Sequence, residues 1–130
     1  MLPPASSSPN AREHWAGKYQ DARVYHDAVF YQCVNARNLG YLEGMSFPFL
    51  KAKLKLTFVF KDHRRRDRDN LITRFKPGQD SIVDSGLILD DDADHLETGD
   101  IVILVDPEQA PLTIIELDEH KGKNETLQKM

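Results

Sequence analysis

Residues 50–60 read LKAKLKLTFVF, and this stretch decides the fold class. Apolar side chains at the even-numbered positions alternate with Lys51, Lys53, Lys55 and Thr57. A period of two is typical of a β-strand, in which successive side chains point to opposite faces of a sheet. The stretch therefore predicts a half-buried strand with lysines on its outer face. Such a face suits contact with phosphate, although a solvated surface is the commoner reason for the pattern.

The residues before this strand follow a helical period instead. From about Tyr19 to Asn38, apolar residues recur every three or four positions, which predicts a helix. The residues on its apolar face are Ala22, Tyr25, Val29, Cys33 and Ala36. Gly40 is the expected helix stop, because glycine readily adopts the left-handed conformation that ends many helices.

A second helical pattern follows the polar stretch KDHRRRDRDN at residues 61–70. Its apolar face consists of Leu71, Phe75, Ile82 and Val83, and Gly86 is the expected stop. Pro77 interrupts the pattern, because proline has no backbone N–H to donate and its ring clashes with the preceding turn. The sequence therefore predicts either a kink at Pro77 or a separate helix that begins there.

Two further strands are expected near the end of the chain, at IVILV (101–105) and LTIIELD (112–118), with a turn at DPEQAP between them. Strands and helices that do not alternate regularly indicate a mixed α/β (α+β) fold. At 130 residues the chain is long enough for one domain. We expect an irregular N-terminal arm at 1–10, a folded domain at 11–120 and a frayed tail at 121–130.

Composition excludes several classes of protein. With one cysteine, Cys33, the chain has no internal disulfide and no cysteine-based zinc site. No apolar run approaches the roughly 20 residues that span a bilayer, and the N-terminus does not resemble a secretion signal. These observations favour a cytoplasmic location. The net charge of −4 conceals a division, since residues 1–80 carry a net +6 and residues 81–130 a net −10. A chain divided in this way can present a basic face to phosphates.

Acidic residues gather at two places where apolar segments end. Asp67 and Asp69 lie two apart between the predicted strand and the second helical pattern, and Asp90–Asp92 follow an apolar run. In extended backbone, residues two apart point to the same side, so both members of the first pair can face one pocket. Asp69 is also a candidate helix cap. Lys76, seven residues after Asp69, would lie two helical turns along on the same face.

Carboxylates held close together raise one another's pKa values, and a hard divalent cation relieves their repulsion. Oxygen ligands select Mg²⁺, with Mn²⁺ as a substitute, and such a cation supports phosphodiester hydrolysis. Beside these acids the sequence places Arg64, Arg65, Arg66 and Arg68. Four guanidinium groups in five residues suit a phosphate backbone, and an exposed basic turn is the alternative interpretation.

The stretch RRRDRDNLITRFKPGQDSIVDSGLILDDD, residues 64–92, resembles the RusA family of Holliday junction resolvases, particularly its phage and prophage members. The shared features are DxDN, a downstream lysine, D-x5-G and a closing DD, and SPNAREHW at 8–15 is similar to the family's opening segment. The resemblance implies a RusA-like mixed sheet with two main helices. It also implies a homodimer that cuts branched DNA with Mg²⁺ and without a small-molecule cofactor.

The same resemblance implies a role for each matching residue. The metal ligands would be Asp67, Asp69, Asp90 and Asp91. The catalytic residues would be Asp67, Asp69, Lys76 and Asp91. The DNA-binding residues would be Asn10 and the four arginines. The best-known members carry the lysine four residues after the second aspartate, where this chain has Thr73. Three alternatives stay open: a nuclease for flaps or forks, a branched-DNA-binding module that does not cut, and an accessory domain whose acidic half binds a protein.

Overall fold

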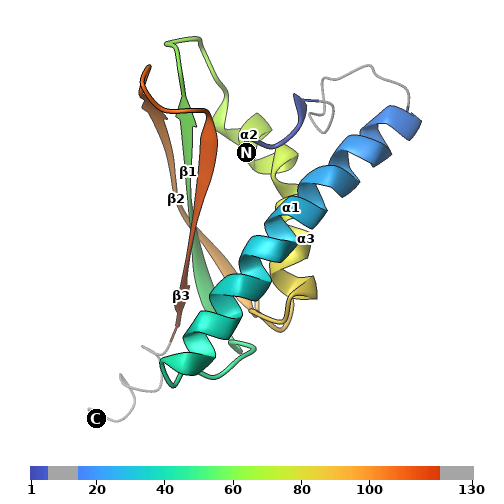
Figure 1. Ribbon diagram of the computed structural model, residues 1–130, viewed down its shortest axis with the longest axis vertical. Coiled ribbons are helices and arrows are strands. Elements are labelled where there is room, and N and C mark those ends of the chain that lie inside the picture. The colour runs from blue at the N-terminus through green and yellow to red at the C-terminus, as the bar shows by residue number, and fades with distance from the viewer. Residues whose placement is uncertain (6–14, 121–130) are drawn as a thin grey trace.

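A computed structural model describes residues 1–5 and 15–120, and it confirms the predicted α+β fold. The elements in chain order are α1 (Trp15–Leu42), β1 (Ala52–Phe60), α2 (Arg68–Arg74), α3 (Lys76–Asp84), β2 (Leu96–Val105) and β3 (Leu112–Glu119). The second predicted helix is therefore two helices. Figure 1 shows all three helices on one side of the sheet. No helix in the described ranges is long and apolar enough to cross a membrane.

The strand predicted from LKAKLKLTFVF is the central strand of the sheet. The strand order is β2-β1-β3, with β1 parallel to β2 and antiparallel to β3. The inward side chains of β1 are all buried: Ala52, Leu54, Leu56, Phe58 and Phe60. Leu50 lies before the strand and is 71% exposed, so the predicted start was two residues too early. Thr57 and Val59 on the other face are also buried, whereas Lys53 on that face is exposed as predicted.

The expected helix stop at Gly40 was wrong, because α1 continues to Leu42. Gly40 lies inside the helix, and a Cβ atom built on it would lie 2.7 Å from Cε2 and Cζ of Phe47. The glycine is therefore required by the close approach of an aromatic ring rather than by a left-handed backbone. The left-handed residue is Gly44, with φ +85°.

Pro77 lies in the first turn of a separate helix, so the second of the two predicted alternatives is confirmed, with a start one residue earlier. Helix α2 ends at Arg74, Phe75 caps both helices, and α3 begins at Lys76 with the proline in its first turn. Gly78 allows the buried Phe75 ring to lie against α3, since a Cβ there would lie 2.7 Å from Cε1 of that ring. Gly86, with φ +83°, follows the end of α3 and confirms the predicted stop.

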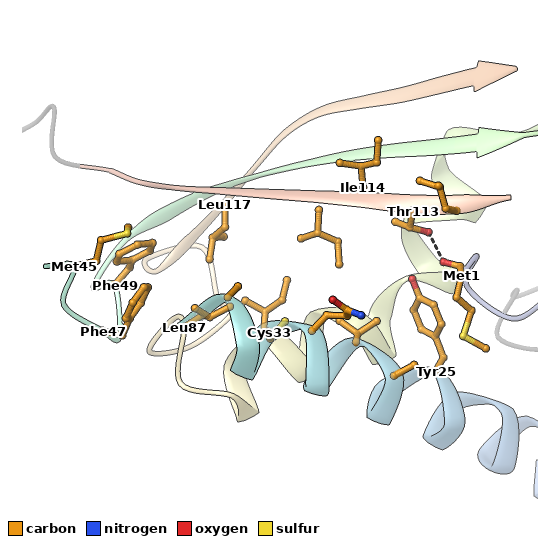
Figure 2. A pocket seen from close by; sticks show the side chains of 17 residues that line it. Met1, Tyr25, Cys33, Met45, Phe47, Phe49, Leu87, Thr113, Ile114 and Leu117 are labelled. Carbon is orange, nitrogen blue, oxygen red and sulfur yellow. Dashed lines mark hydrogen bonds between the residues drawn. The ribbon is translucent and has the colours of Figure 1, made fainter. Parts of the chain in front are cut away.

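The core lies between the helices and the inner face of the sheet. Tyr25, Val29 and Cys33 of α1 are buried as predicted, and they line a cavity of about 720 Å³ against β3 (Figure 2). The first residues of the chain lie beside this cavity, because Thr113 Oγ1 donates to the Met1 carbonyl at 2.8 Å. The N-terminal segment is thereby attached to β3.

Candidate functional site

The connection from β1 to β2 contains every candidate residue except Asn10, which lies outside the described residues. Its first part places Asp67 immediately before α2. Asp67 has an extended backbone (φ −99°, ψ 122°), and its Oδ1 accepts a hydrogen bond from the backbone N of Asp69 at 2.9 Å. Asp67, and not Asp69, is therefore the helix cap. Asp69 is already helical, so the expected extended backbone across both residues was wrong, although Asp67 and Asp69 do line one hollow.

The arginines beside these acids differ in what they contact. Arg66 stacks on Phe60, with its guanidinium carbon 3.6 Å from the ring centroid, and it donates to Asp62 Oδ1 at 2.8 Å. Arg68 donates through Nε to the Ile101 carbonyl at 3.2 Å. Arg64 forms an ion pair with Asp62, and its side chain is 81% exposed. Some arginines of the cluster therefore hold the local structure through contacts with neighbouring residues, and others form an exposed basic surface.

A polar hollow of about 690 Å³ lies at the start of α2. It is lined by Arg65, Arg66, Asp67, Arg68, Asp69, Asn70, Leu71 and Arg74. Arg74 was not predicted as a site residue, and its Nη2 donates to the Pro3 carbonyl at 2.7 Å. Its position one helical turn after Asn70, and so on the same face of α2, could have indicated it from the sequence. Arg74 therefore connects the hollow to the N-terminal segment.

The second part of the site is an ion-paired network at the start of α3. Lys76 Nζ donates to Asp80 Oδ1 at 2.8 Å and to Asp91 Oδ2 at 2.6 Å. Gln79 Nε2 donates to the same Asp91 oxygen at 3.2 Å. The lysine and the third carboxylate, 15 residues apart in sequence, therefore meet. Gln79 and Asp80 were not selected from the sequence, although their spacing of three and four from Lys76 places them on its face of the helix.

The lysine and the carboxylates of this network each stabilise the charged form of the other. The carboxylates of Asp80 and Asp91 raise the pKa of Lys76 above its ordinary value. The hydrogen bonds from Lys76 and then from Gln79 lower the pKa of Asp91. The lysine is thus held charged and the aspartate ionised. The expected path from Asp69 to Lys76 along one continuous helix was wrong, because the chain changes helix at Phe75.

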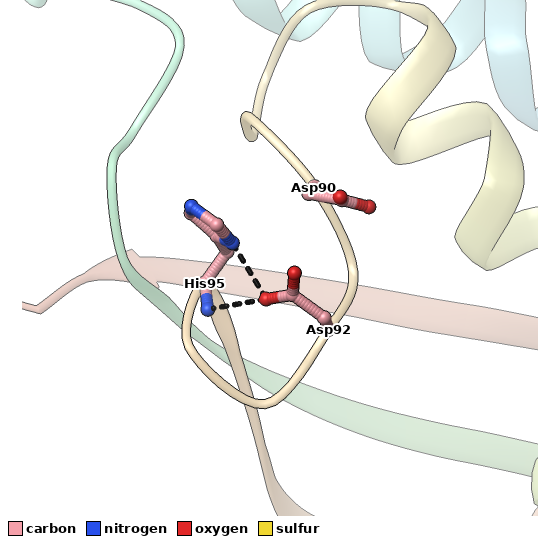
Figure 3. A group of neighbouring side chains, drawn as sticks. All are labelled: Asp90, Asp92 and His95. Atoms are coloured by element: carbon pink, nitrogen blue, oxygen red, sulfur yellow. Dashed lines mark hydrogen bonds and ion pairs between the residues drawn. The ribbon is translucent and has the colours of Figure 1, made fainter.

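Asp90 and Asp92 face a different group from Asp91. Figure 3 shows them beside His95, and the potential ligand atoms of the three residues lie within 4.8 Å of one another. Asp92 Oδ1 accepts from His95 Nδ1 at 2.6 Å and from its backbone N at 3.1 Å. Asp90 Oδ1 accepts from the backbone N of Asp91 at 2.7 Å. These hydrogen bonds all lie within the loop that precedes β2.

The chemistry of the predicted metal ligands fits a hard divalent cation, because all of them are carboxylates. In the structure these carboxylates are less closely clustered than the prediction implies. Within residues 1–5 and 15–120, the group just described is the one set of three potential ligands within 4.8 Å of one another, so Asp67, Asp69 and Asp91 do not form such a set. In this arrangement Lys76 supplies the positive charge that balances Asp91.

The comparisons with known proteins are sparse. No protein-family model matches the chain, and no solved structure matches it. A protein of Xylella fastidiosa (strain Temecula1 / ATCC 700964), described as uncharacterized, is 36% identical over 85 residues. That match covers 64% of this chain and 52% of the relative, so the chain spans about half the length of the curated relative it matches.

Proposed function

We propose that this chain is a RusA-type endonuclease that resolves four-way DNA junctions by paired nicks, with Mg²⁺ as its cofactor. The observation that supports this most directly is the 2.6 Å contact between Lys76 Nζ and Asp91 Oδ2. The resemblance implies that Lys76 and Asp91 serve one site, although Lys76 stands three positions later than the lysine of the best-known members. The contact between the two side chains supports that implication.

Asp67, Asp69, Asp90 and Asp91 are the residues that would hold the cation, and they would have to draw together to do so, because no three of them form one set of ligands within 4.8 Å in the described residues. When bound, Mg²⁺ activates a water and stabilises the charge that develops on the phosphate. Asp91 stays ionised because Lys76 and Gln79 donate to it. Lys76 presents further N–H donors, and it would contact a non-bridging oxygen of the scissile phosphate.

Substrate binding would be dominated by the basic surface at the start of α2. Arg64 and Arg65 are exposed and suit contact with the phosphate backbone, whereas Arg66 fixes the turn that presents them. Asn10 would add a contact from the N-terminal arm. A four-way junction is close to two-fold symmetric, so paired nicks require two sites and hence a homodimer. The substrate would be a recombination or replication intermediate in the cytoplasm of a bacterial or phage-infected cell.

Cleavage of a labelled synthetic four-way junction tests the proposal. The wild type is compared with Asp91→Asn, with Mg²⁺ and with EDTA, beside linear duplex, flap and fork substrates. We expect paired symmetric nicks that need both Mg²⁺ and Asp91, with junction binding retained in the variant. Preferential cutting of flaps or forks would change the substrate class. Tight junction binding without any cut by the wild type would make the chain a binding module and refute the enzyme.

A further inference from the structure

The apolar cavity between α1 and β3 takes no part in the proposed reaction. It extends from Tyr25 and Thr113 at one end to Phe47 and Phe49 at the other (Figure 2). Ala36 of α1 lines it and is exposed, so the cavity is a groove that opens to solvent beside the helix. An open apolar groove of about 720 Å³ favours an apolar partner.

The surface of α1 beside this groove is also apolar. Val24, Tyr31 and Leu39 are 49%, 73% and 54% exposed. Together with Ala28, which lines the groove, and Asn35, they follow one another every three or four residues and form one helical stripe. None of the five carries a charge. An uncharged apolar surface with an exposed tyrosine is typical of a contact between proteins and does not suit a phosphate backbone.

The other wall of the groove is an edge strand. Among the strands of the described residues, only β1 pairs with β3. The N–H and C=O groups on the far side of such a strand are a template for one more strand. The charges of β3 all lie in its second half, at Glu116, Asp118 and Glu119, and residues 112–115 carry none.

This division of charge favours a second copy of the chain in one orientation. If two β3 strands run antiparallel with the symmetry axis at Ile115, Glu116 lies opposite the partner's Ile114, and Asp118 lies opposite the partner's Leu112. An axis at Glu116 would instead place two carboxylates directly opposite each other, which is unfavourable. The axis at Ile115 therefore pairs most of the strand while each acid meets an uncharged residue.

We propose that the groove and the stripe of α1 bind a second copy of this chain, with the two β3 strands paired antiparallel around Ile115. The two sheets would form one continuous sheet, and both α1 helices would lie on the same side of it with their stripes in contact. Tyr31 and Leu39 of each copy would cover the groove of the other. The choice of a second copy rests on the proposed function, which requires two subunits, whereas the place of contact rests on the groove, the stripe and the strand edge.

The first experiment measures the mass of the full chain in solution by light scattering across a dilution series, without DNA or a metal ion. We expect a dimer for the wild type. Tyr31→Lys and Leu39→Lys should each raise the dimer Kd at least about 30-fold, because each buries an unpaired ammonium in the interface. Leu104→Lys is the control, since Leu104 is a 49% exposed leucine on β2, at the opposite edge of the sheet, and should leave the Kd unchanged.

The second experiment tests the pairing of the strands by disulfide formation. Directly opposite residues of antiparallel strands have Cα atoms about 4.5–5.5 Å apart, which is within the range of a disulfide. A mixture of Ile114→Cys and Glu116→Cys chains should therefore form a mixed disulfide at least about fivefold faster than either variant forms one with itself. Leu104→Cys mixed with Glu116→Cys is the control. The buried Cys33 is common to all samples and sets the background.

A monomeric wild type would overturn the inference, and the groove would then be filled by another segment of the chain, such as 121–130, or by a different molecule. A dimer that keeps its Kd in Tyr31→Lys and Leu39→Lys would overturn it as well, because its interface would lie elsewhere. Equal rates for the Ile114→Cys and Leu104→Cys mixtures would exclude the pairing of the β3 strands. A dimer that passes both tests but cuts no four-way junction would refute the proposed function and leave this interface standing.

Discussion

Replacing Lys76 with methionine separates cation binding from cleavage. The substitution removes the ammonium group but keeps a side chain of similar length. Lys76 is 56% exposed and Asp91 is 23% exposed, so solvent screens their interaction in spite of the 2.6 Å separation. Pairs of this kind contribute about 1 kcal/mol at most. The Lys76 ammonium would compete with Mg²⁺ for Asp91. Removing a competing interaction of that strength should tighten Mg²⁺ binding about fivefold, because each 1.4 kcal/mol is a factor of ten in the binding constant.

Cleavage should change in the opposite direction. A lysine that contacts the scissile phosphate is a major source of transition-state stabilisation, and we expect Lys76→Met to cut at least about 100-fold more slowly. The assay is a calorimetric Mg²⁺ titration of the free protein beside single-turnover cleavage of a four-way junction. Arg23→Met, a change in an exposed cation on α1, is the control. Weaker Mg²⁺ binding by Lys76→Met would refute the argument that lysine and cation compete for Asp91.

Three other expectations can be checked separately. Arg64→Ala with Arg65→Ala should weaken junction binding and reduce the slope of log K against log salt by up to about 1.8, measured by fluorescence anisotropy; an unchanged slope would exclude both side chains from the interface. Burial lowers the pKa of His26, but two neighbouring carboxylates outweigh it and raise that pKa above its ordinary value of 6.5. The stabilisation is complete below pH 6.5 and is lost as the pH rises through the folded-state pKa, so thermal melts should show a wild-type advantage over His26→Gln at pH 6 that shrinks by pH 8.5. Gly78→Ala places a Cβ atom 2.7 Å from the Phe75 ring and should cost about 1–3 kcal/mol in urea unfolding, and a fully stable variant would mean that the ring moves freely.

The sequence predicted the parts of the fold that depend on periodicity. The alternation in 50–60 identified the central strand. On the predicted apolar face of α1, Tyr25, Val29 and Cys33 are buried, but Ala22 is half-buried and Ala36 is exposed. A glycine was harder to interpret, because the same residue serves a left-handed turn and a close approach. Gly86 is of the first kind and Gly40 of the second, and only the position of Phe47 distinguishes them.

The candidate site was predictable as a set of residues but not as an arrangement. Spacing along the chain does not reveal that Arg66 is held by Phe60, or that Asp91 and its neighbour Asp92 face different groups. Both outcomes depend on contacts between distant segments or on bonds within a loop. The role of Lys76 depended in the same way on where the helix breaks.

The parallel pairing of β1 with β2 has a consequence for how such a site can vary. Two parallel neighbours need a long crossover, and here residues 61–95 form it and contain nearly the whole candidate site. Between its two ends this segment is also held by a β-bridge from Ile88 to Phe49 and by buried side chains of its helices. A change in its length that preserves these contacts would leave the register of every strand unchanged. Within this crossover, residues that are far apart in sequence come together, as Lys76 and Asp91 do, without any change in the pairing of the strands.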